Sequence, residues 1–344
     1  MKIYLAGTTV CSVDRGGLIA DLFRSKLHSY YHCGNEQGFE REWFMKNKQN
    51  KIDLFLDSGA FSAYTQGVQI NLDEYIAFVH EHLPYLSVYA NLDVIGDAEA
   101  TLQNQKKMEA AGLHPLPCFH YGEPISYLTH YLKHYDYVAI GGVAQASTSA
   151  LVPWLDELFA SYICGKDGWP TVKVHGFAVT SLRLMKRYPW YSVDSTSWVV
   201  TGRMGSVYVP KYRQGMWDYT QDSYKVAVST RSPSKKEAGQ HIDTFSERER
   251  EVIHQYFAHK GYQLGCSEFR LESDQYELKD GERWNGKVRV DGKREVEKII
   301  EPGLSNDYML RDELNIIYFL DLERSLPEWP WPFKLSESAK GFGL

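Results

Sequence analysis

Short apolar runs recur along residues 1–210, and each ends in a polar or glycine-rich sequence. The runs are KIYLAG, DLFLDSG, LSVYANLD, HPLPCF, YVAIGG, TVKVHGFA, YSVDS and SVYVP. Segments with helical spacing separate them; one of these, DAEATLQNQKKMEAAG, begins with a capping residue, Asp97, and ends at Gly112. Strands that alternate with helices indicate parallel β-α units. Eight such strands predict an α/β fold of the (β/α)8 TIM-barrel type, and a doubly wound open sheet is the alternative that the pattern leaves open.

The pattern changes after residue 236. The segment TFSEREREVIHQYFAHKGY predicts a helix with a capping box, Ser246 and Glu249, and with Gly261 after its last turn. The next segment predicts antiparallel strands, because it contains the turn dipeptides Asp280-Gly281, Asn285-Gly286 and Asp291-Gly292. A last apolar helix ends before Pro327. We therefore expect a barrel over residues 1–236 and a C-terminal α+β subdomain over residues 237–344.

Composition restricts the setting of the protein. Of the 344 residues, 43% are hydrophobic and 24% are charged, which is typical of a globular protein with a sizeable core. The five cysteines (Cys11, Cys33, Cys118, Cys164, Cys266) form no C-x-x-C pair, so neither a disulfide framework nor a cysteine-rich zinc site is expected. No secretion signal and no apolar run of membrane-spanning length is recognised. These features predict a cytoplasmic protein that does not enter a membrane.

The charge of the chain is unevenly distributed. The net charge is −6, yet seven basic residues stand against two acidic ones between Val200 and Lys236, with aromatic residues among them. Basic and aromatic side chains together suit a nucleic-acid backbone with exposed bases. We expect this contact from Arg203, Lys211, Tyr212, Arg213 and Trp217. A solvated, structural loop region is the alternative.

Three aspartates follow apolar strands: Asp57 in FLDSG, Asp93 in ANLDV and Asp194 in SVDST. In a parallel β-α protein the carboxyl ends of the strands meet at one edge, so we expect these side chains to converge. A single strand-end aspartate commonly caps a helix or fixes a turn. Three such residues favour a catalytic site.

Other strand ends supply candidates for ligand binding. Gly141 and Gly142 in AIGGVAQ, and Gly176 in VHGFAV, would let a flat ligand approach the backbone, or would only relieve crowding between strands. His120 and Tyr121 in CFHYGE are candidates for wall or stacking groups, with ordinary half-buried packing as the alternative.

The motifs LDSGAFSAY, NLDVIGD, CFHYGE, AIGGVAQ, VHGFAV and SVDSTSW, in this order, resemble the barrel of the tRNA-guanine transglycosylase superfamily. The greatest similarity is to its shorter, phage-associated branch, the DNA 7-deazaguanine transglycosylases, and it covers residues 1–215. The tRNA enzymes carry a Cys-x-Cys-x-x-Cys zinc cluster after the barrel. This sequence has no such motif, which favours the DNA branch.

The resemblance implies a role for each matching residue. Asp57, in the D-S-G motif with Ser58 and Gly59, corresponds to the general acid/base, and Asp194 corresponds to the nucleophile. The residues implied in binding the base are Ser58, Gly59, Asp93, His120, Tyr121, Gly141, Gly142 and Gly176. A family glutamine is replaced near His120 or Tyr121. Neither a metal nor an organic cofactor is implied.

The expected reaction is exchange of guanine in DNA for a free 7-deazaguanine base such as preQ0, through a covalent aspartyl-glycosyl intermediate. Base exchange needs one carboxylate that captures an oxocarbenium-like carbon and another that protonates the leaving base. A guanine in duplex DNA must first be flipped out of the stack. The alternatives are a tRNA-guanine transglycosylase, a retaining glycoside hydrolase and a non-catalytic nucleic-acid-binding protein.

Overall fold

The computed structural model describes residues 1–7, 24–32, 37–143, 146–231 and 239–335. Cys11, Cys33, Lys235, Lys236 and the expected domain boundary after residue 236 lie outside these residues. The chain divides into two compact units, one of Met1–Thr196 with Leu326–Leu344, and one of Ser197–Ser325. The boundary between the units lies after Thr196, well before residue 236, and the segment from Leu326 onward belongs to the first unit.

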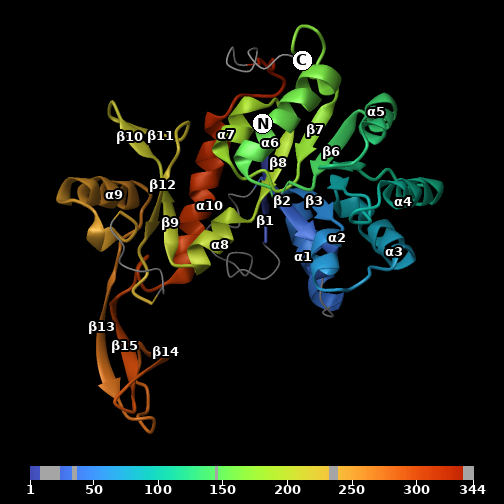
Figure 1. Cartoon of the computed structure of the whole chain (residues 1–344). Helices are drawn as coiled ribbons and strands as arrows, with labels where there is room; N and C mark the ends of the chain where they lie inside the picture. Colours follow the sequence, from blue (N-terminus) through green and yellow to red (C-terminus); the bar gives the residue numbers. More distant parts are fainter. Residues whose placement is uncertain (8–23, 33–36, 144–145, 232–238, 336–344) are drawn as a thin grey trace. The chain divides into compact units, whose positions relative to one another are not determined.

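The first unit is built on an eight-stranded, all-parallel sheet (Figure 1) with the order β4-β3-β2-β1-β8-β7-β6-β5. Its strands are β1 (Lys2–Ala6), β2 (Ser25–Ser29), β3 (Asp53–Asp57), β4 (Val88–Tyr89), β5 (Cys118–His120), β6 (Tyr137–Gly141), β7 (Lys173–Gly176) and β8 (Ser192–Ser195). An isolated parallel bridge joins Ala90 to Leu116. There the Asn91 amide donates to the Leu116 carbonyl at 3.0 Å, and the Leu116 amide donates to that of Tyr89 at 2.8 Å. The sheet is curled and compatible with a TIM-like α/β fold.

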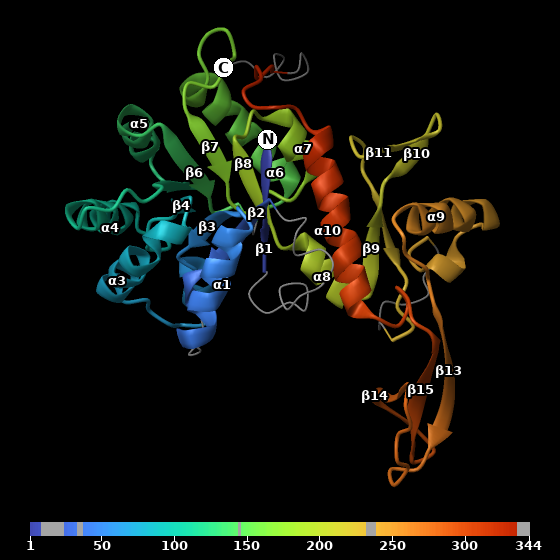
Figure 2. The same cartoon turned by 180° about the vertical axis from the view of Figure 1, so that it is seen from behind.

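Helices connect the strands of this sheet. They are α1 (Gln37–Gln49), α2 (Ala60–Thr65), α3 (Leu72–His82), α4 (Ala98–Ala110), α5 (Ile125–His134), α6 (Thr148–Leu158) and α7 (Leu182–Arg187), with short turns η3 (Tyr30–His32), η4 (Leu83–Tyr85) and η5 (Phe159–Ile163). Figures 1 and 2 show α3, α4 and α5 on the outer side of the sheet. The predicted cap of α4 is confirmed, because the Asp97 side chain accepts from the Ala100 amide at 2.9 Å.

Side chains from successive strands fill the concave side of the curled sheet. This buried cluster consists of Tyr4, Ala6, Leu27, Phe55, Ala90, Leu116, Cys118 and Ala139. The rings of Tyr4 and Phe55 meet edge to face at 5.3 Å between centroids. Because helices cover the other face, parallel strands are buried on both sides, which explains the nearly continuous apolar runs in the sequence.

Strand β2 was missed by the apolar pattern. Its sequence, SKLHS, reads as polar, yet Ser25, Lys26 and His28 are all buried. His28 packs against Trp43 at 4.6 Å between ring centroids. Burial lowers the pKa of His28 to about 3, so its imidazole is neutral near pH 7 and suits the core. A polar sequence therefore forms a central strand because its side chains have aromatic neighbours.

The run SVYVP was counted as the eighth barrel strand, and this assignment was wrong. It forms β9 (Ser206–Val209), which pairs antiparallel with β12 (Tyr224–Ala227) in the second unit. Val207 and Val226 pack there in a core with Tyr256 and Leu314. The other elements of this unit are α8 (Ser197–Arg203), β10 (Lys211–Arg213), β11 (Met216–Asp218), η6 (Ile242–Thr244), α9 (Glu247–His259), β13 (Cys266–Glu272), β14 (Glu282–Val290), β15 (Lys293–Glu301) and α10 (Tyr308–Ser325).

The second unit contains the local signals noted after residue 236. The Ser246–Glu249 capping box opens α9. Strands β13, β15 and β14 form an antiparallel sheet, and Asp291-Gly292 turns β14 into β15. Asn285-Gly286 does not form a turn between strands. It lies inside β14 at a register shift between Trp284 and Arg289, where Gly286 has a φ of 61°.

Among the described helices, none combines the length and apolar character that a bilayer span requires.

Candidate active site

A cavity of about 450 Å³ opens where the strands of the first unit end. Its wall includes residues in or just after every strand of the sheet: Ala6, Ser29, Asp57, Asp93, His120, Gly141, Ala178 and Asp194. The three aspartates singled out from the sequence therefore converge as expected. The volume lies in the range of small-molecule sites, about 300–1,000 Å³.

Asp57 is the last residue of β3, and the small residues after it shape its surroundings. The Gly59 amide donates to Asp57 Oδ2 at 3.0 Å. Gly59 has a φ of 75°, and a Cβ there would lie 2.5 Å from Ser29 Oγ. The D-S-G sequence thus needs glycine at its third position, both for the backbone conformation and for space.

The charge of Asp57 is disfavoured in this cavity. Burial, followed by the nearby carboxylates of Asp194 and Asp93, raises the pKa of Asp57 to about 7, although backbone amides of Gly59 and Ser58 act in the opposite direction. A carboxyl group with such a pKa exchanges its proton near neutral pH, which is what a general acid/base requires.

Asp194 is fixed in a different environment. It lies in β8, its side chain is 11% exposed, and the Ala178 amide donates to its Oδ1 at 2.7 Å. Ala178 has a φ of 55°, in the left-handed region that residues other than glycine rarely occupy. This strained turn directs an amide at the carboxylate and so fixes its orientation.

His175 lies behind Asp194 and was not singled out in the sequence. Its Nε2 is 3.5 Å from Asp194 Oδ1, and its Nδ1 lies 2.7 Å from the Ser192 hydroxyl, which in turn contacts the Tyr137 hydroxyl at 2.6 Å. Burial lowers the pKa of His175, so the imidazole is neutral. If Tyr137 donates to Ser192 and Ser192 donates to Nδ1, the ring proton lies on Nε2, which faces Asp194 but has no hydrogen-bond partner in the structure. The only sequence signal was a histidine inside an apolar strand.

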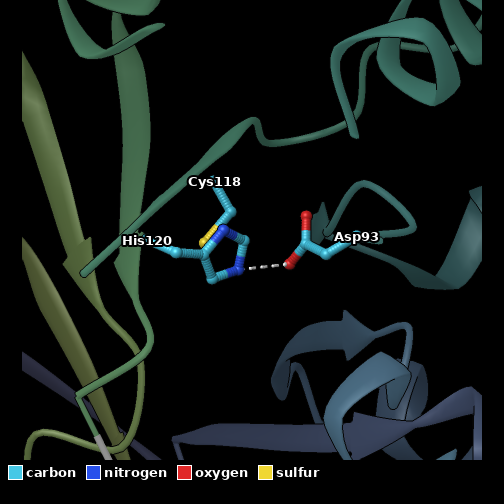
Figure 3. A group of neighbouring side chains, drawn as sticks. All are labelled: Asp93, Cys118 and His120. Carbon is cyan, nitrogen blue, oxygen red and sulfur yellow. Dashed lines mark hydrogen bonds and ion pairs between the residues drawn. The ribbon is translucent and has the colours of Figure 1, made fainter. Parts of the chain in front are cut away.

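His120 lies between two carboxylates, those of Glu123 and of Asp93, and Figure 3 shows the contact with Asp93. Its Nε2 is 3.1 Å from Asp93 Oδ2 and its Nδ1 is 3.0 Å from Glu123 Oε1, while its backbone amide donates to Glu123 Oε2 at 2.9 Å. Burial acts to lower the pKa of His120, but Cys118 and Asp93 outweigh it and raise the pKa well above the usual range. Asp93 Oδ1 is buried and has no hydrogen-bond partner in the structure. That oxygen is enclosed by the protein, and a ligand that donates an N–H would reach it once the Asp93 side chain turns toward the cavity.

Two glycines make room for this histidine. A Cβ on Gly141 would lie 2.8 Å from Cys118 Sγ and 2.9 Å from His120 Cδ2. Gly142 has a φ of 74°, and a Cβ there would lie 2.9 Å from the Tyr121 amide. Both glycines line the cavity, and the contacts of Gly141 are those of a glycine that relieves crowding, the alternative explanation.

Two predicted binding residues do not line the cavity. Tyr121 is 45% exposed and packs edge to face on Trp154. Gly176 is buried, and a Cβ there would lie 2.7 Å from Val179 Cγ2 and 3.1 Å from the Trp190 ring. Gly176 thus permits close packing at the end of β7, which was the alternative explanation for this glycine.

The predicted nucleic-acid contacts lie in the second unit. Lys211, Tyr212 and Arg213 form β10, which pairs with β11, and the Tyr212 and Trp217 rings contact each other across that pair at 4.6 Å between centroids, tilted by 51°. Tyr212 and Arg213 are exposed, whereas Lys211 lies over the Tyr224 ring. A cavity of about 370 Å³ beside β10 is lined by Lys211, Tyr212, Arg213, Tyr224, Arg248 and Glu249, among others. Arg203, the last residue of α8, is exposed.

One group in the described part of the chain has the composition of a metal site. Asp93, Cys118 and His120 each present one ligand atom within 4.8 Å of the other two.

Comparison of the chain with protein-family models, curated proteins and solved structures finds no match in any of the three.

Proposed function

We propose that this protein is a DNA-guanine transglycosylase that replaces guanine in DNA with a free 7-deazaguanine base such as preQ0. The observation that carries the proposal is the convergence of Asp57, Asp93 and Asp194 on one cavity beside Gly141 and Gly142. Base exchange requires a nucleophile, a proton donor and a surface that recognises a flat heterocycle, and this set of groups suits all three tasks.

In the proposed reaction, Asp194 attacks C1′ of the deoxyribose, so that the bond from C1′ to the base breaks and a glycosyl ester forms. Asp57 transfers its proton to the departing guanine. The incoming base returns a proton to Asp57 and displaces Asp194, which restores the enzyme with retention at C1′. The pKa of Asp57, about 7, supports its use as both acid and base near neutral pH.

Binding of the base is assigned to the opposite wall. Asp93 Oδ1 accepts from a ring N–H, while His120 holds Oδ2 at 3.1 Å and so fixes the carboxylate. The amides at Gly141 and Gly142 are assigned to the carbonyl oxygen of the base. Guanine presents a ring N1–H and an exocyclic amine side by side, next to a carbonyl group; adenine and the pyrimidines do not present this edge and would bind weakly.

We also propose that the parallel sheet is a closed (β/α)8 barrel. The order of the strands and the bridge between Ala90 and Leu116 support this assignment. DNA is preferred over tRNA as the substrate because the sequence carries no Cys-x-Cys-x-x-Cys motif. The substrates of the proposed reaction are a guanine flipped out of DNA and free 7-deazaguanine. The exposed residues Tyr212 and Arg213 are the proposed DNA contacts, and the proposed setting is the cytoplasm.

The test is incubation of the purified protein with preQ0 and either guanine-containing DNA or tRNA, followed by mass spectrometry of the nucleosides. We expect a deazaguanine nucleoside in the DNA. Its appearance only in tRNA would transfer the assignment to the tRNA enzymes, and its absence from both would refute base exchange. The Asp194→Asn variant should lose exchange and retain DNA binding. A non-catalytic DNA-binding protein would show no exchange even as the wild type.

A further inference from the structure

Asp93, Cys118 and His120 come together because of the geometry of two neighbouring strand ends. Cys118 and His120 are two residues apart in β5, so their side chains point to the same face. Asp93 follows β4, which the Ala90–Leu116 bridge joins to the segment entering β5. Figure 3 shows the Cys118 sulfur beside the His120 ring, and the Asp93 carboxylate facing its Nε2.

The three ligand atoms are of the types that zinc prefers. Zinc binds thiolate sulfur, imidazole nitrogen and carboxylate oxygen at about 2.0–2.3 Å in tetrahedral geometry, so its ligand atoms lie roughly 3.3–3.6 Å apart. Here His120 Nε2 and Asp93 Oδ2 are 3.1 Å apart, and all three ligand atoms lie within 4.8 Å of one another.

The surroundings of His120 match those of a zinc ligand. Metal-bound histidines usually donate their second ring N–H to a carboxylate, which fixes the tautomer and the ring orientation. Glu123 Oε1 lies 3.0 Å from His120 Nδ1, and Glu123 Oε2 is itself held by the His120 amide. The second oxygen of the Asp93 carboxylate, Oδ1, is buried and has no partner.

We propose that Asp93, Cys118 and His120 bind one zinc ion whose fourth position faces the cavity. Binding releases the proton of the Cys118 thiol and the proton shared between His120 and Asp93. The resulting thiolate and carboxylate of the ligands balance the two charges of zinc in a largely buried environment. The proposal that zinc binds here does not depend on the proposed function. If that function holds, zinc also inhibits exchange, because it occupies Asp93.

The test is titration of the chelator-treated, full-length protein with zinc chloride by calorimetry, together with the absorption spectrum of the Co²⁺-loaded protein. We expect one metal ion per chain and an intense near-ultraviolet band from thiolate-to-cobalt charge transfer. Cys118→Ser should remove this band, and His120→Gln should abolish tight binding. Glu123→Gln should weaken binding about 10- to 100-fold, since it alters the support of a ligand and not a ligand itself.

Cys164→Ser is the matched control, because Cys164 is a half-buried cysteine of the same unit outside this cluster. It should leave the affinity and the spectrum unchanged. Wild-type protein that binds no zinc, or a cobalt complex without the thiolate band, would overturn the proposal. These two wild-type measurements test the proposal even if Cys118→Ser fails to fold. An exchange assay with and without zinc reports separately on the proposed function.

Discussion

Replacing Asp57 by asparagine tests the electrostatics of the cavity without any substrate. Asparagine keeps an oxygen that can accept from the Gly59 amide but removes the charge. The pKa of Asp57 is raised from 3.8 to about 7, which at about 1.4 kcal/mol per pH unit corresponds to about 4 kcal/mol against the ionised form in the folded protein. This free energy should appear in the pH dependence of folding.

The sign follows from proton binding. Because folding raises this pKa, between pH 4 and pH 7 the folded protein holds a proton that the unfolded chain has lost, and the contribution of Asp57 to stability falls as the pH rises through this range. From pH 5 to pH 7 the loss amounts to about 2 kcal/mol, and residual solvent screening reduces it. Because Asp57 is only half ionised at pH 7, the loss is complete about one pH unit higher.

The measurement is urea unfolding of wild type and Asp57→Asn at several values from pH 5 to pH 8. The free energy of unfolding of the variant should rise relative to wild type by about 2–3 kcal/mol over this range. Infrared difference spectra should show a protonated carboxyl band that titrates near pH 7 in wild type and is weaker in the variant, where Asp312, whose pKa burial also raises to about 7, still contributes. Asp136→Asn, at an exposed carboxylate, is the control and should show neither effect. Parallel pH profiles for wild type and Asp57→Asn would refute the reasoning.

Three further perturbations test other parts of the molecule. Gly59→Ala should lower the free energy of unfolding by more than the roughly 1–2 kcal/mol that left-handed backbone strain costs, because the added Cβ also meets Ser29. Gly67 has a φ of 67° but open space around it, so Gly67→Ala should show the cost of the strain alone in the same urea experiment. His175→Phe keeps the ring packing against Phe55 but removes the polar contact to Asp194. The rate of base exchange should therefore fall about 10²-fold, with KM for the base unchanged. An unchanged rate would contradict a positioning role for His175. Arg213→Ala should reduce the salt dependence of DNA binding by about 0.9 in the slope of log K against log salt, while Arg289→Ala, an exposed arginine of the same unit, should not.

The convergence of the three aspartates could be predicted from the sequence because it depends only on strand direction. Carboxyl ends of parallel strands share an edge, and Asp57, Asp93 and Asp194 each follow an apolar run. The D-S-G motif was informative for a similar local reason. Its glycine satisfies a backbone conformation that the structure shows directly, with a φ of 75°.

The remaining features depend on tertiary interactions that a single sequence does not display. β2 reads as polar, and only the aromatic neighbours of His28 explain its place in the sheet. SVYVP has the same pattern as a barrel strand, but its partner is β12, downstream in the chain. His175 looks like any core histidine until Ser192 and Asp194 are placed beside it. Tyr121 and Gly176 show the opposite error, since residues at a strand end need not face the cavity.

The bridge between Ala90 and Leu116 has a dynamic consequence. β4 contains two residues and is joined to the segment before β5 by two backbone hydrogen bonds, whereas β1 and β8 pair over four residues. Amide hydrogen exchange should therefore be faster at Asn91 and Leu116 than along β1 and β8. Breaking the two hydrogen bonds of this bridge would separate Asp93, which follows β4, from His120, which ends β5. The stability of this short pairing thus affects how well the cavity retains a ligand that binds between Asp93 and His120.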